Sequence, residues 1–248
     1  MRVVNARKRS EIVDFIGSLV PCQIDDKLIR LGGGNDGGYL VPDQLDGIEA
    51  CFSPGVAAQT EFERDCLKRG IAIHMADASV DDPHLDGQDV PTSFEKKFLG
   101  SSTQKEFIRL DDWVHSKCPG TSDLMLQMDI EGSEYEVLHS MSDSLLERMR
   151  IMVIEFHGLN DVWFGGGRFI MSSIRKIAAS HRVVHVHPNN ADPVYKWFNV
   201  QIPNSLEVTF MRKSSCLRVG GRAELPHHLD EPCLGGRPEV VLENPWVE

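Results

Sequence analysis

The chain has 248 residues, of which 41% are hydrophobic and 25% are charged, the composition of an ordinary globular protein. No stretch approaches the roughly 18 apolar residues that a membrane-spanning helix needs, and the basic N-terminus lacks the apolar core of a signal peptide. The net charge of −11 argues against nucleic acid as a partner, because such binding depends on cationic groups that neutralise phosphates. We therefore expect a cytoplasmic protein with no membrane span.

The six cysteines are scattered at positions 22, 51, 66, 118, 216 and 233, and no two of them form a C-x-x-C pair. This spacing fits neither a zinc ribbon nor a small disulfide scaffold. Reduced thiols are the expectation, in keeping with a cytoplasmic location.

Residues 1–47 are predicted to form an N-terminal helix followed by a glycine-rich hairpin. Apolar residues recur with helical spacing over residues 7–20, and the pattern stops before Pro21. The stretch "KLIRLGGGNDGGYLVP" (27–42) then predicts two short strands around a turn. That turn has two interpretations: a hairpin turn whose residues need positive φ, or a loop that lines a site with Asn35, Asp36 and Tyr39.

From residue 48 onwards, short apolar runs alternate with segments of helical periodicity. Strands are expected at 48–54, 71–77, 94–100, 123–129, 150–157, 182–188 and 205–213, and helices at 58–69, 110–117, from 133 and at 168–180. Repeated strand-then-helix units predict an α/β fold with a doubly wound, mostly parallel sheet. We expect this domain to cover 48–213, and 214–248 to form an irregular C-terminal extension rich in Gly, Pro and Arg.

Two loops at the carboxyl ends of the predicted strands suggest a nucleoside ligand, because ligands of open parallel sheets bind there. Gly55 allows a tight turn after the first strand, next to a helix start with free N–H groups. The second strand ends at Asp77, which could accept hydrogen bonds from a ribose diol or could simply stabilise a turn. With no G-x-G-x-x-G and no Walker lysine, a ligand with a ribose but no diphosphate, such as S-adenosylmethionine, fits better than NAD.

Acids and histidines follow the later strands and are expected at one rim of the sheet. Asp129 ends the fourth strand, and Glu155 and His157 share a face of the fifth. His187 and Asn189 follow in "HVHPNN" (185–190) on the sixth. Two chemistries remain open: oxygen ligands with an imidazole could hold a divalent cation, or a histidine oriented by a carboxylate could act as a general base.

The stretch "LQMDIEGSEYEVL" (126–138), with "LDDWV" before it and "MVIEFHG" after it, resembles the FkbM-type S-adenosylmethionine-dependent methyltransferases. Asp129, Glu131, Gly132 and Glu134 match the family pattern D-x-E-G-x-E. "NDGGYLVP", "HPNN" and "LEVTF" extend the resemblance over residues 28–213. The loop at Gly55 departs from the family's commoner D-x-G-x-x-x-G form, because it keeps only one glycine.

The resemblance implies a class I methyltransferase, a Rossmann-like single domain whose seven-stranded sheet has an antiparallel final strand. It implies S-adenosyl-L-methionine as cofactor and methyl transfer to an oxygen of a sugar or glycan-linked small molecule. The expected cofactor contacts are Asn35, Asp36, Ser53, Gly55, Val56, Asp77, Ala78 and Asp129. By analogy with metal-dependent methyltransferases of the same fold, Mg²⁺ or Mn²⁺ would bind Asp129, Glu155 and His157.

The catalytic residues implied by the resemblance are Asp129, near the transferred methyl group, and either His157 or His187 as the proton acceptor. Glu131 and Glu134 stand at the start of the next helix, where the helix dipole favours acids, and we expect no catalytic role for them. A nicotinamide-dependent oxidoreductase, a metal-dependent hydrolase and a non-catalytic binding protein on the same fold are the competing interpretations. The sequence leaves a homo-oligomer open.

Overall fold

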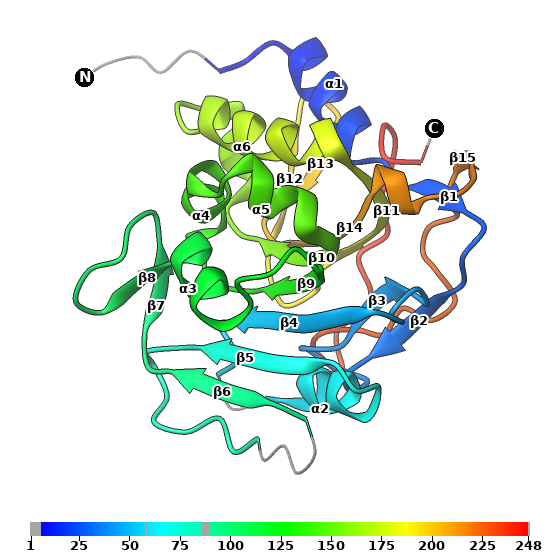
Figure 1. The fold of residues 1–248 in the computed structure, drawn as a ribbon. Coiled ribbons are helices and arrows are strands. Elements are labelled where there is room, and N and C mark those ends of the chain that lie inside the picture. The colour runs from blue at the N-terminus through cyan, green and yellow to red at the C-terminus, as the bar shows by residue number, and fades with distance from the viewer. Residues whose placement is uncertain (1–5, 58, 86–89, 248) are drawn as a thin grey trace.

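The computed structural model describes residues 6–57, 59–85 and 90–247, which are built around one seven-stranded sheet (Figure 1). Its strand order is β6–β5–β4–β9–β10–β14–β11, and the strands are β4 (Ile48–Pro54), β5 (Ala72–Ala76), β6 (Thr92–Glu95), β9 (Asp123–Met128), β10 (Met149–Phe156), β11 (His181–Pro188) and β14 (Leu206–Arg212). Strand β14 is antiparallel to both of its neighbours, and the other six strands point the same way. The expected α/β fold is confirmed, including the doubly wound sheet and its antiparallel final strand.

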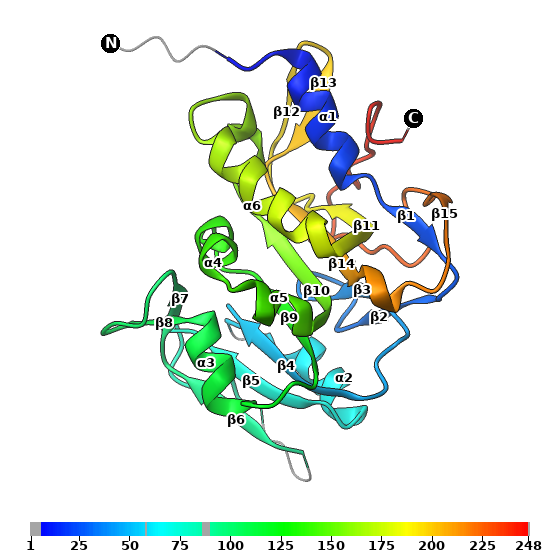
Figure 2. The same cartoon turned by 45° about the horizontal axis from the view of Figure 1, so that its top comes forward.

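Both faces of the sheet are covered, because its central strands are apolar on both sides (Figure 2). Leu126 and Ile154 belong to one core, whereas the adjacent Met125 and Val153 belong to a second core on the opposite face. The first core lies against α1 (Arg9–Leu19), α3 (Leu110–Lys117), α4 (Glu134–Ser140), α5 (Asp143–Arg148) and α6 (Gly167–Ser180). The second lies against α2 (Glu61–Lys68) and the hairpin of β2 (Leu28–Leu31) and β3 (Tyr39–Pro42). Across the described residues, no helix is long and apolar enough to cross a membrane.

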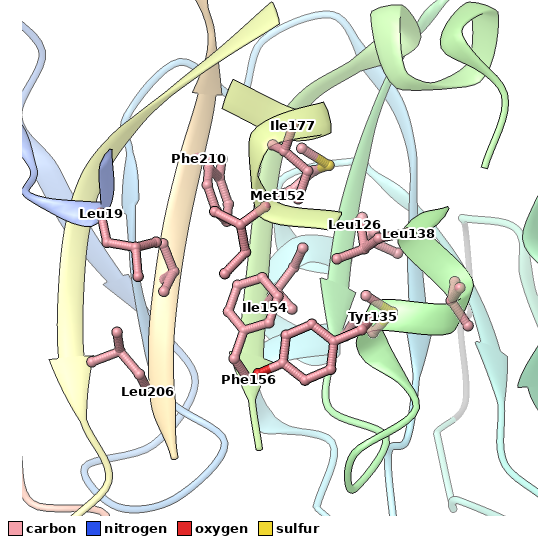
Figure 3. Packing of buried hydrophobic residues seen from close by; sticks show 14 of the residues in the cluster. Leu19, Leu126, Tyr135, Leu138, Met152, Ile154, Phe156, Ile177, Leu206 and Phe210 are labelled. Carbon is pink, nitrogen blue, oxygen red and sulfur yellow. The ribbon is translucent and has the colours of Figure 1, made fainter. Parts of the chain in front are cut away.

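The core beside β10 fixes the place where this strand ends (Figure 3). Met152, Ile154 and Phe156 line one side of β10 and belong to the same core as Tyr135 of α4. The rings of Tyr135 and Phe156 are stacked, with their centroids 5.4 Å apart. The Tyr135 hydroxyl also donates a hydrogen bond of 3.0 Å to the backbone carbonyl of His157. Helix α4 therefore holds the residue that follows β10 through both an apolar and a polar contact.

The segment before residue 48 contacts both the sheet and the C-terminal extension. Strand β3 of the hairpin lies against β10 and β14, where the Thr209 hydroxyl donates a hydrogen bond of 2.7 Å to the Leu40 carbonyl. Strand β1 (Cys22–Ile24) pairs with β15 (Val219–Arg222), so the N-terminal segment and the C-terminal extension share a small sheet. The remaining elements are β7 (Phe98–Gly100), β8 (Phe107–Arg109), β12 (Val194–Trp197), β13 (Val200–Pro203), η1 (Leu159–Trp163) and η2 (Lys213–Ser215).

The structure departs from the expected elements in several places. The strand expected at 94–100 is divided, because β6 stays in the sheet while β7 pairs with β8 outside it. The helix expected at 58–69 begins at Glu61, and position 58 lies outside the described residues. Helix α5, strand β15 and the hairpin of β12 and β13 were not predicted. That hairpin turns at Phe198 and Asn199, which both have positive φ without the Asn-Gly pair that usually marks such a turn.

Gly55 joins the ends of three strands. Its backbone has a φ of 83°, and a Cβ atom on it would lie 1.6 Å from the carbonyl oxygen of Asp129. The Gly55 N–H donates to the Ala76 carbonyl at 3.0 Å, and the Asp129 N–H donates to the Pro54 carbonyl at 3.3 Å. Only glycine lets the backbones after β4 and β9 approach this closely. Backbone packing therefore explains the glycine before any ligand is considered.

We predict that Gly55→Ala lowers the free energy of unfolding by at least about 2 kcal/mol, because it adds a backbone clash to the strain of a positive φ. Gly70→Ala is the matched control, since Gly70 has a φ of 77° but no atom within 4 Å of an added Cβ. Chemical denaturation of both variants measures the difference. Equal losses in the two variants would show that the close approach contributes nothing.

Candidate active site

A cavity of about 670 Å³ opens at the carboxyl ends of β4, β5 and β9, within the size range of small-molecule sites. Strand β4 lies between β5 and β9, so the cavity stands where the strand order reverses, the usual ligand position in an open α/β sheet. Its walls come from the glycine-rich turn, the loops after these strands and the flap made by β7 and β8. The lining residues include Asp36, Tyr39, Gly55, Asp77, Phe98, Phe107, Gln127 and Asp129.

Asp77 directly follows β5, and its carboxylate ties two loops together. Oδ2 accepts a hydrogen bond from the backbone N–H of Ala57 at 2.9 Å. Oδ1 accepts hydrogen bonds from the backbone N–H and the hydroxyl of Ser79, at 2.7 and 2.6 Å. Because each carboxylate oxygen has two lone pairs, Oδ2 retains room for one hydrogen bond from a ligand in the cavity.

The residues expected to contact a cofactor fall into two groups. Those that line the cavity are Asp36, Gly55, Val56, Asp77 and Asp129. The other three do not line it: Ser53 is fully buried, Asn35 is exposed and Ala78 is half-buried. Asn35 and Asp36 thus differ in role although they are neighbours in the glycine-rich turn.

Three of the expected rim residues meet beside this cavity, at the ends of β9 and β10. The Nε2 atom of His157 lies 3.8 Å from Asp129 Oδ1 and 3.8 Å from Glu155 Oε1. Burial raises the pKa of Asp129 to about 7, although the nearby His157 lowers it. Burial also raises the pKa of Glu155 well above its ordinary value, and the charge of Asp129 adds to the rise. Two carboxyl groups and one imidazole therefore share a site in which negative charge is costly.

Glu134, the last acid of the D-x-E-G-x-E pattern, holds the ring of His157. Its side chain is fully buried, and Oε1 accepts a hydrogen bond of 2.9 Å from the Gly132 N–H while lying 3.1 Å from His157 Nδ1. Desolvation lowers the pKa of His157, but the hydrogen bond to Glu134 and the charges of Glu134, Glu155 and Asp129 outweigh it and raise the pKa to about 9. The sequence assigned Glu134 to the helix start alone, because periodicity does not show that its carboxylate reaches the end of β10.

In the part of the chain that the structure describes, histidine is the only positive partner of the rim acids Asp129, Glu134 and Glu155. Among the described residues, the ion pairs of Asp129, Glu134 and Glu155 are all with His157. In the same part of the chain, one buried oxygen on each of these acids has no hydrogen-bond partner: Asp129 Oδ1, Glu134 Oε2 and Glu155 Oε2. Asp129, Glu131 and His157 also present ligand atoms that lie within 4.8 Å of one another. Unpartnered carboxylate oxygens beside an imidazole fit a divalent cation.

Comparison with known proteins finds one family similarity. Residues 71–182 match the family model described as the methyltransferase FkbM domain. This segment of the chain is therefore similar to the methyltransferase FkbM domain. A search of curated proteins finds no match. A solved structure described as "Conversion of a Disulfide Bond into a Thioacetal Group during Echinomycin Biosynthesis" aligns with 11% identity and a TM-score of 0.36, over 68% of this chain and 78% of that chain.

Two expected rim residues lie beyond the segment that matches the FkbM family. The Asn189 side chain reaches the rim, where Nδ2 donates a hydrogen bond of 2.8 Å to Glu155 Oε1. His187 does not line the cavity. Its Nδ1 lies 3.0 Å from Glu207 Oε2, and its Nε2 lies 3.4 Å from Glu239 Oε2. Both ring nitrogens of His187 thus face carboxylates, and one of these belongs to the C-terminal extension.

The sequence pattern did not predict a buried polar network in the wall of the cavity, to which Glu63 and Gln127 belong. The Ser53 hydroxyl contacts both Glu63 Oε1 and Gln127 Oε1, the latter at 2.6 Å. One hydroxyl hydrogen cannot serve two acceptors, so this arrangement fits a proton on the Glu63 carboxyl group, or a Gln127 amide that turns its NH2 group towards Ser53. Burial raises the pKa of Glu63 to about 7, although the Ser53 hydrogen bond lowers it. The one sequence signal for Glu63 is its place beside the buried Phe62 on α2.

We predict that Glu63 makes the protein less stable as the pH rises. The folded state holds the Glu63 proton with a pKa of about 7, against an ordinary value of 4.5, so stability falls by about 3 kcal/mol as the pH rises between these values. Glu63→Gln keeps a donor towards Ser53 and should remove this dependence, whereas Glu61→Gln, on the exposed side of α2, should retain it. Urea unfolding between about pH 5 and about pH 8 measures both variants. The same pH slope in wild type and Glu63→Gln would contradict the assignment.

Proposed function

We propose that the protein transfers a methyl group from S-adenosyl-L-methionine to a hydroxyl oxygen of a sugar or glycan-linked small molecule. The observation that supports this is a single cavity bordered by Asp77 at one strand end and by Asp129 at another. A ligand that contacts the first through its ribose can therefore reach the acidic rim with its reactive end. The acceptor class comes from the family resemblance and stays a proposal.

The cofactor would be bound mainly by the loops after β4 and β5. The free lone pair on Asp77 Oδ2 is available to a ribose hydroxyl, and the positive φ of Gly55 brings the loop backbone to the cavity wall. Gln127 and the protonated Glu63 offer polar contacts deeper in the cavity. S-Adenosylmethionine supplies an activated methyl group on a sulfonium, so the protein has to position and deprotonate the acceptor.

We assign the divalent cation, Mg²⁺ or Mn²⁺, to the carboxylates of Asp129 and Glu155. Each has a buried oxygen without a hydrogen-bond partner among the described residues, and each has a pKa raised by burial, which a bound cation would reverse. Such an ion supplies orientation of the acceptor's oxygens and a lower hydroxyl pKa. The imidazole of His157 is the third group within reach.

His157 has only one nitrogen available for chemistry. Its Nδ1 is committed to Glu134, so Nε2 can either complete the cation's ligand set or accept the acceptor's proton, but not both. We assign proton acceptance to Nε2, because Glu134 fixes the ring with this atom towards Asp129 and Glu155. The carboxylates that raise the pKa of His157 to about 9 lose this influence once positive charge binds beside them.

His187 is the weaker candidate for the base. Its ring nitrogens face Glu207 and Glu239, and it does not line the cavity. We also keep the expected division of the chain as a proposal: residues 1–47 and 214–248 flank a methyltransferase domain at 48–213. Strand β3 lies against β10 and β14, and β1, which pairs with β15, contacts β11. The cytoplasmic location, the absence of a nucleic-acid partner and a homo-oligomer likewise remain proposals.

We predict that calorimetric titration detects one site for S-adenosylmethionine and none for NAD⁺. Asp77→Asn should weaken the binding about 10- to 100-fold, because it removes a charged hydrogen-bond acceptor from the ribose position. Asp82→Asn, an exposed aspartate that also stabilises a turn, is the matched control and should bind normally. The titration is repeated after chelation and after addition of Mg²⁺ or Mn²⁺. No binding of S-adenosylmethionine under any of these conditions would refute the proposed function.

We predict that His157→Gln lowers turnover about 100- to 10,000-fold while leaving the affinity for S-adenosylmethionine nearly unchanged. His139→Gln, an exposed histidine of α4, and His187→Gln should both retain more than a tenth of the turnover. Rates are measured with the same acceptor in all variants, and Mg²⁺ affinity is measured in parallel. A lower Mg²⁺ affinity in His157→Gln would assign Nε2 to the cation, and unchanged turnover would remove His157 from the mechanism.

A further inference from the structure

A second cluster of metal-ligand groups lies away from the cavity, where the C-terminal extension covers β11 and β14. It consists of His187, Glu207 and Cys233, which are 4%, 6% and 7% exposed. His187 Nδ1 lies 3.0 Å from Glu207 Oε2 and 3.9 Å from Cys233 Sγ, and Cys233 Sγ lies 3.3 Å from Glu207 Oε1. Imidazole, thiol and carboxylate thus converge within 4.8 Å in a buried place.

We propose that His187, Glu207 and Cys233 bind a transition-metal ion of the zinc type, which fastens the C-terminal extension to the sheet. In a tetrahedral zinc site the metal–ligand distances of about 2.0–2.3 Å place neighbouring ligand atoms about 3.3–3.6 Å apart. Of the three separations in this cluster, 3.3 Å falls within that range, and 3.0 and 3.9 Å lie about 0.3 Å below and above it. A set of one nitrogen, one sulfur and one oxygen selects zinc or a similar ion over Mg²⁺, which prefers oxygen alone.

The imidazole of this cluster is held as metal-bound histidines usually are. Its second nitrogen, Nε2, faces Glu239 Oε2 at 3.4 Å, so the ring is oriented with Nδ1 towards Glu207 and Cys233. A carboxylate on the far nitrogen of a ligating histidine is the common outer-shell partner, because it fixes the ring and raises its basicity. Glu239 and Cys233 both come from the extension, so this segment supplies a ligand and the outer partner.

Binding of the ion displaces protons from the cluster, and no other covalent bond of the protein is broken. Without a metal, the Cys233 thiol donates to Glu207 Oε1 and His187 Nδ1 faces Glu207 Oε2, so every group has a partner. With a metal, the thiol proton and the proton on Nδ1 pass to solvent, and sulfur, nitrogen and a carboxylate oxygen each bind the ion. One coordination position remains for water.

The site would join the extension to the cavity as well as to the sheet. The backbone carbonyl of Cys233 accepts a hydrogen bond of 3.1 Å from the N–H of Asp36, which belongs to the glycine-rich turn and lines the cavity. A metal on Cys233 therefore also holds that turn. The ligands of this site are different residues from Asp129, Glu155 and His157. The proposed metal site can therefore be tested independently of the proposed methyl transfer.

The test uses Co²⁺ as a spectroscopic substitute for Zn²⁺ in the full-length protein. Stoichiometric Co²⁺ should give a thiolate-to-cobalt charge-transfer band, which Zn²⁺ displaces and Cys233→Ser abolishes. Glu239→Gln should keep the band and weaken the affinity about 10- to 100-fold. Cys118→Ser is the matched control, because Cys118 Sγ also lies 3.9 Å from an imidazole nitrogen but belongs to no described cluster of three ligand groups. Asp129→Asn should leave the band intact.

Limited proteolysis supplies a readout that does not depend on spectroscopy. Zn²⁺ should slow cleavage within residues 223–247 of the wild type and of Cys118→Ser, but not of Cys233→Ser, whose fold is verified by its retained far-ultraviolet circular dichroism. A band that persists in Cys233→Ser would overturn the proposal. So would wild-type protein that binds no Co²⁺ or Zn²⁺ at micromolar concentration, or a cleavage rate that Zn²⁺ leaves unchanged.

Discussion

The structure depends on one electrostatic constraint: several carboxyl groups are crowded at one edge of the sheet with histidines as their partners. Asp129, Glu134 and Glu155 pair with His157, and Glu207 pairs with His187. A buried carboxylate is costly unless hydrogen bonds or positive charge compensate it. The raised pKa values of Asp129 and Glu155 express that cost. The edge is therefore suited to a cationic ligand, and both a sulfonium cofactor and a divalent metal meet that condition.

Some residues of the D-x-E-G-x-E motif line the cavity, and others hold the local structure in place. Asp129 faces the cavity, and its backbone carbonyl lies against Gly55, so the same residue also fixes how closely two loops approach. Glu134 satisfies the Gly132 N–H and the His157 ring at once, which explains why a buried acid is tolerated at a helix start. Tyr135, the next residue, stacks on Phe156 and bonds the His157 carbonyl. Glu134 and Tyr135 thus position His157, the residue after β10, through its ring and through its backbone carbonyl.

Strand periodicity predicted the sheet and brought Asp129, Glu155 and His157 to one edge, because residues that follow parallel strands share an edge whatever their sequence separation. The rest depended on contacts that periodicity does not encode. His187 lies near the carboxyl end of β11 by the same rule, but Glu239 and Cys233 reach it from an extension with no regular pattern. Glu63 is one acid on an amphipathic helix, and its raised pKa follows from its burial in the tertiary structure, which periodicity does not show. The periodicity of the sequence predicts which residues lie at the carboxyl edge of the sheet. Tertiary packing determines which of their side chains are buried there.

The two clusters at this edge are electrostatically continuous. Glu155, Glu207 and His187 are directly opposite one another on β10, β14 and β11, so their side chains form one row on one face of the sheet. The charge of Glu207 contributes to the raised pKa of both Glu155 and Asp36. Because two protons leave as a divalent ion binds, the net charge of the cluster of His187, Glu207 and Cys233 would stay the same, so Glu207 would continue to raise the pKa of Glu155. The C-terminal extension, which contacts Glu207 through Cys233, therefore lies against the same row of charges as the rim although it does not line the cavity.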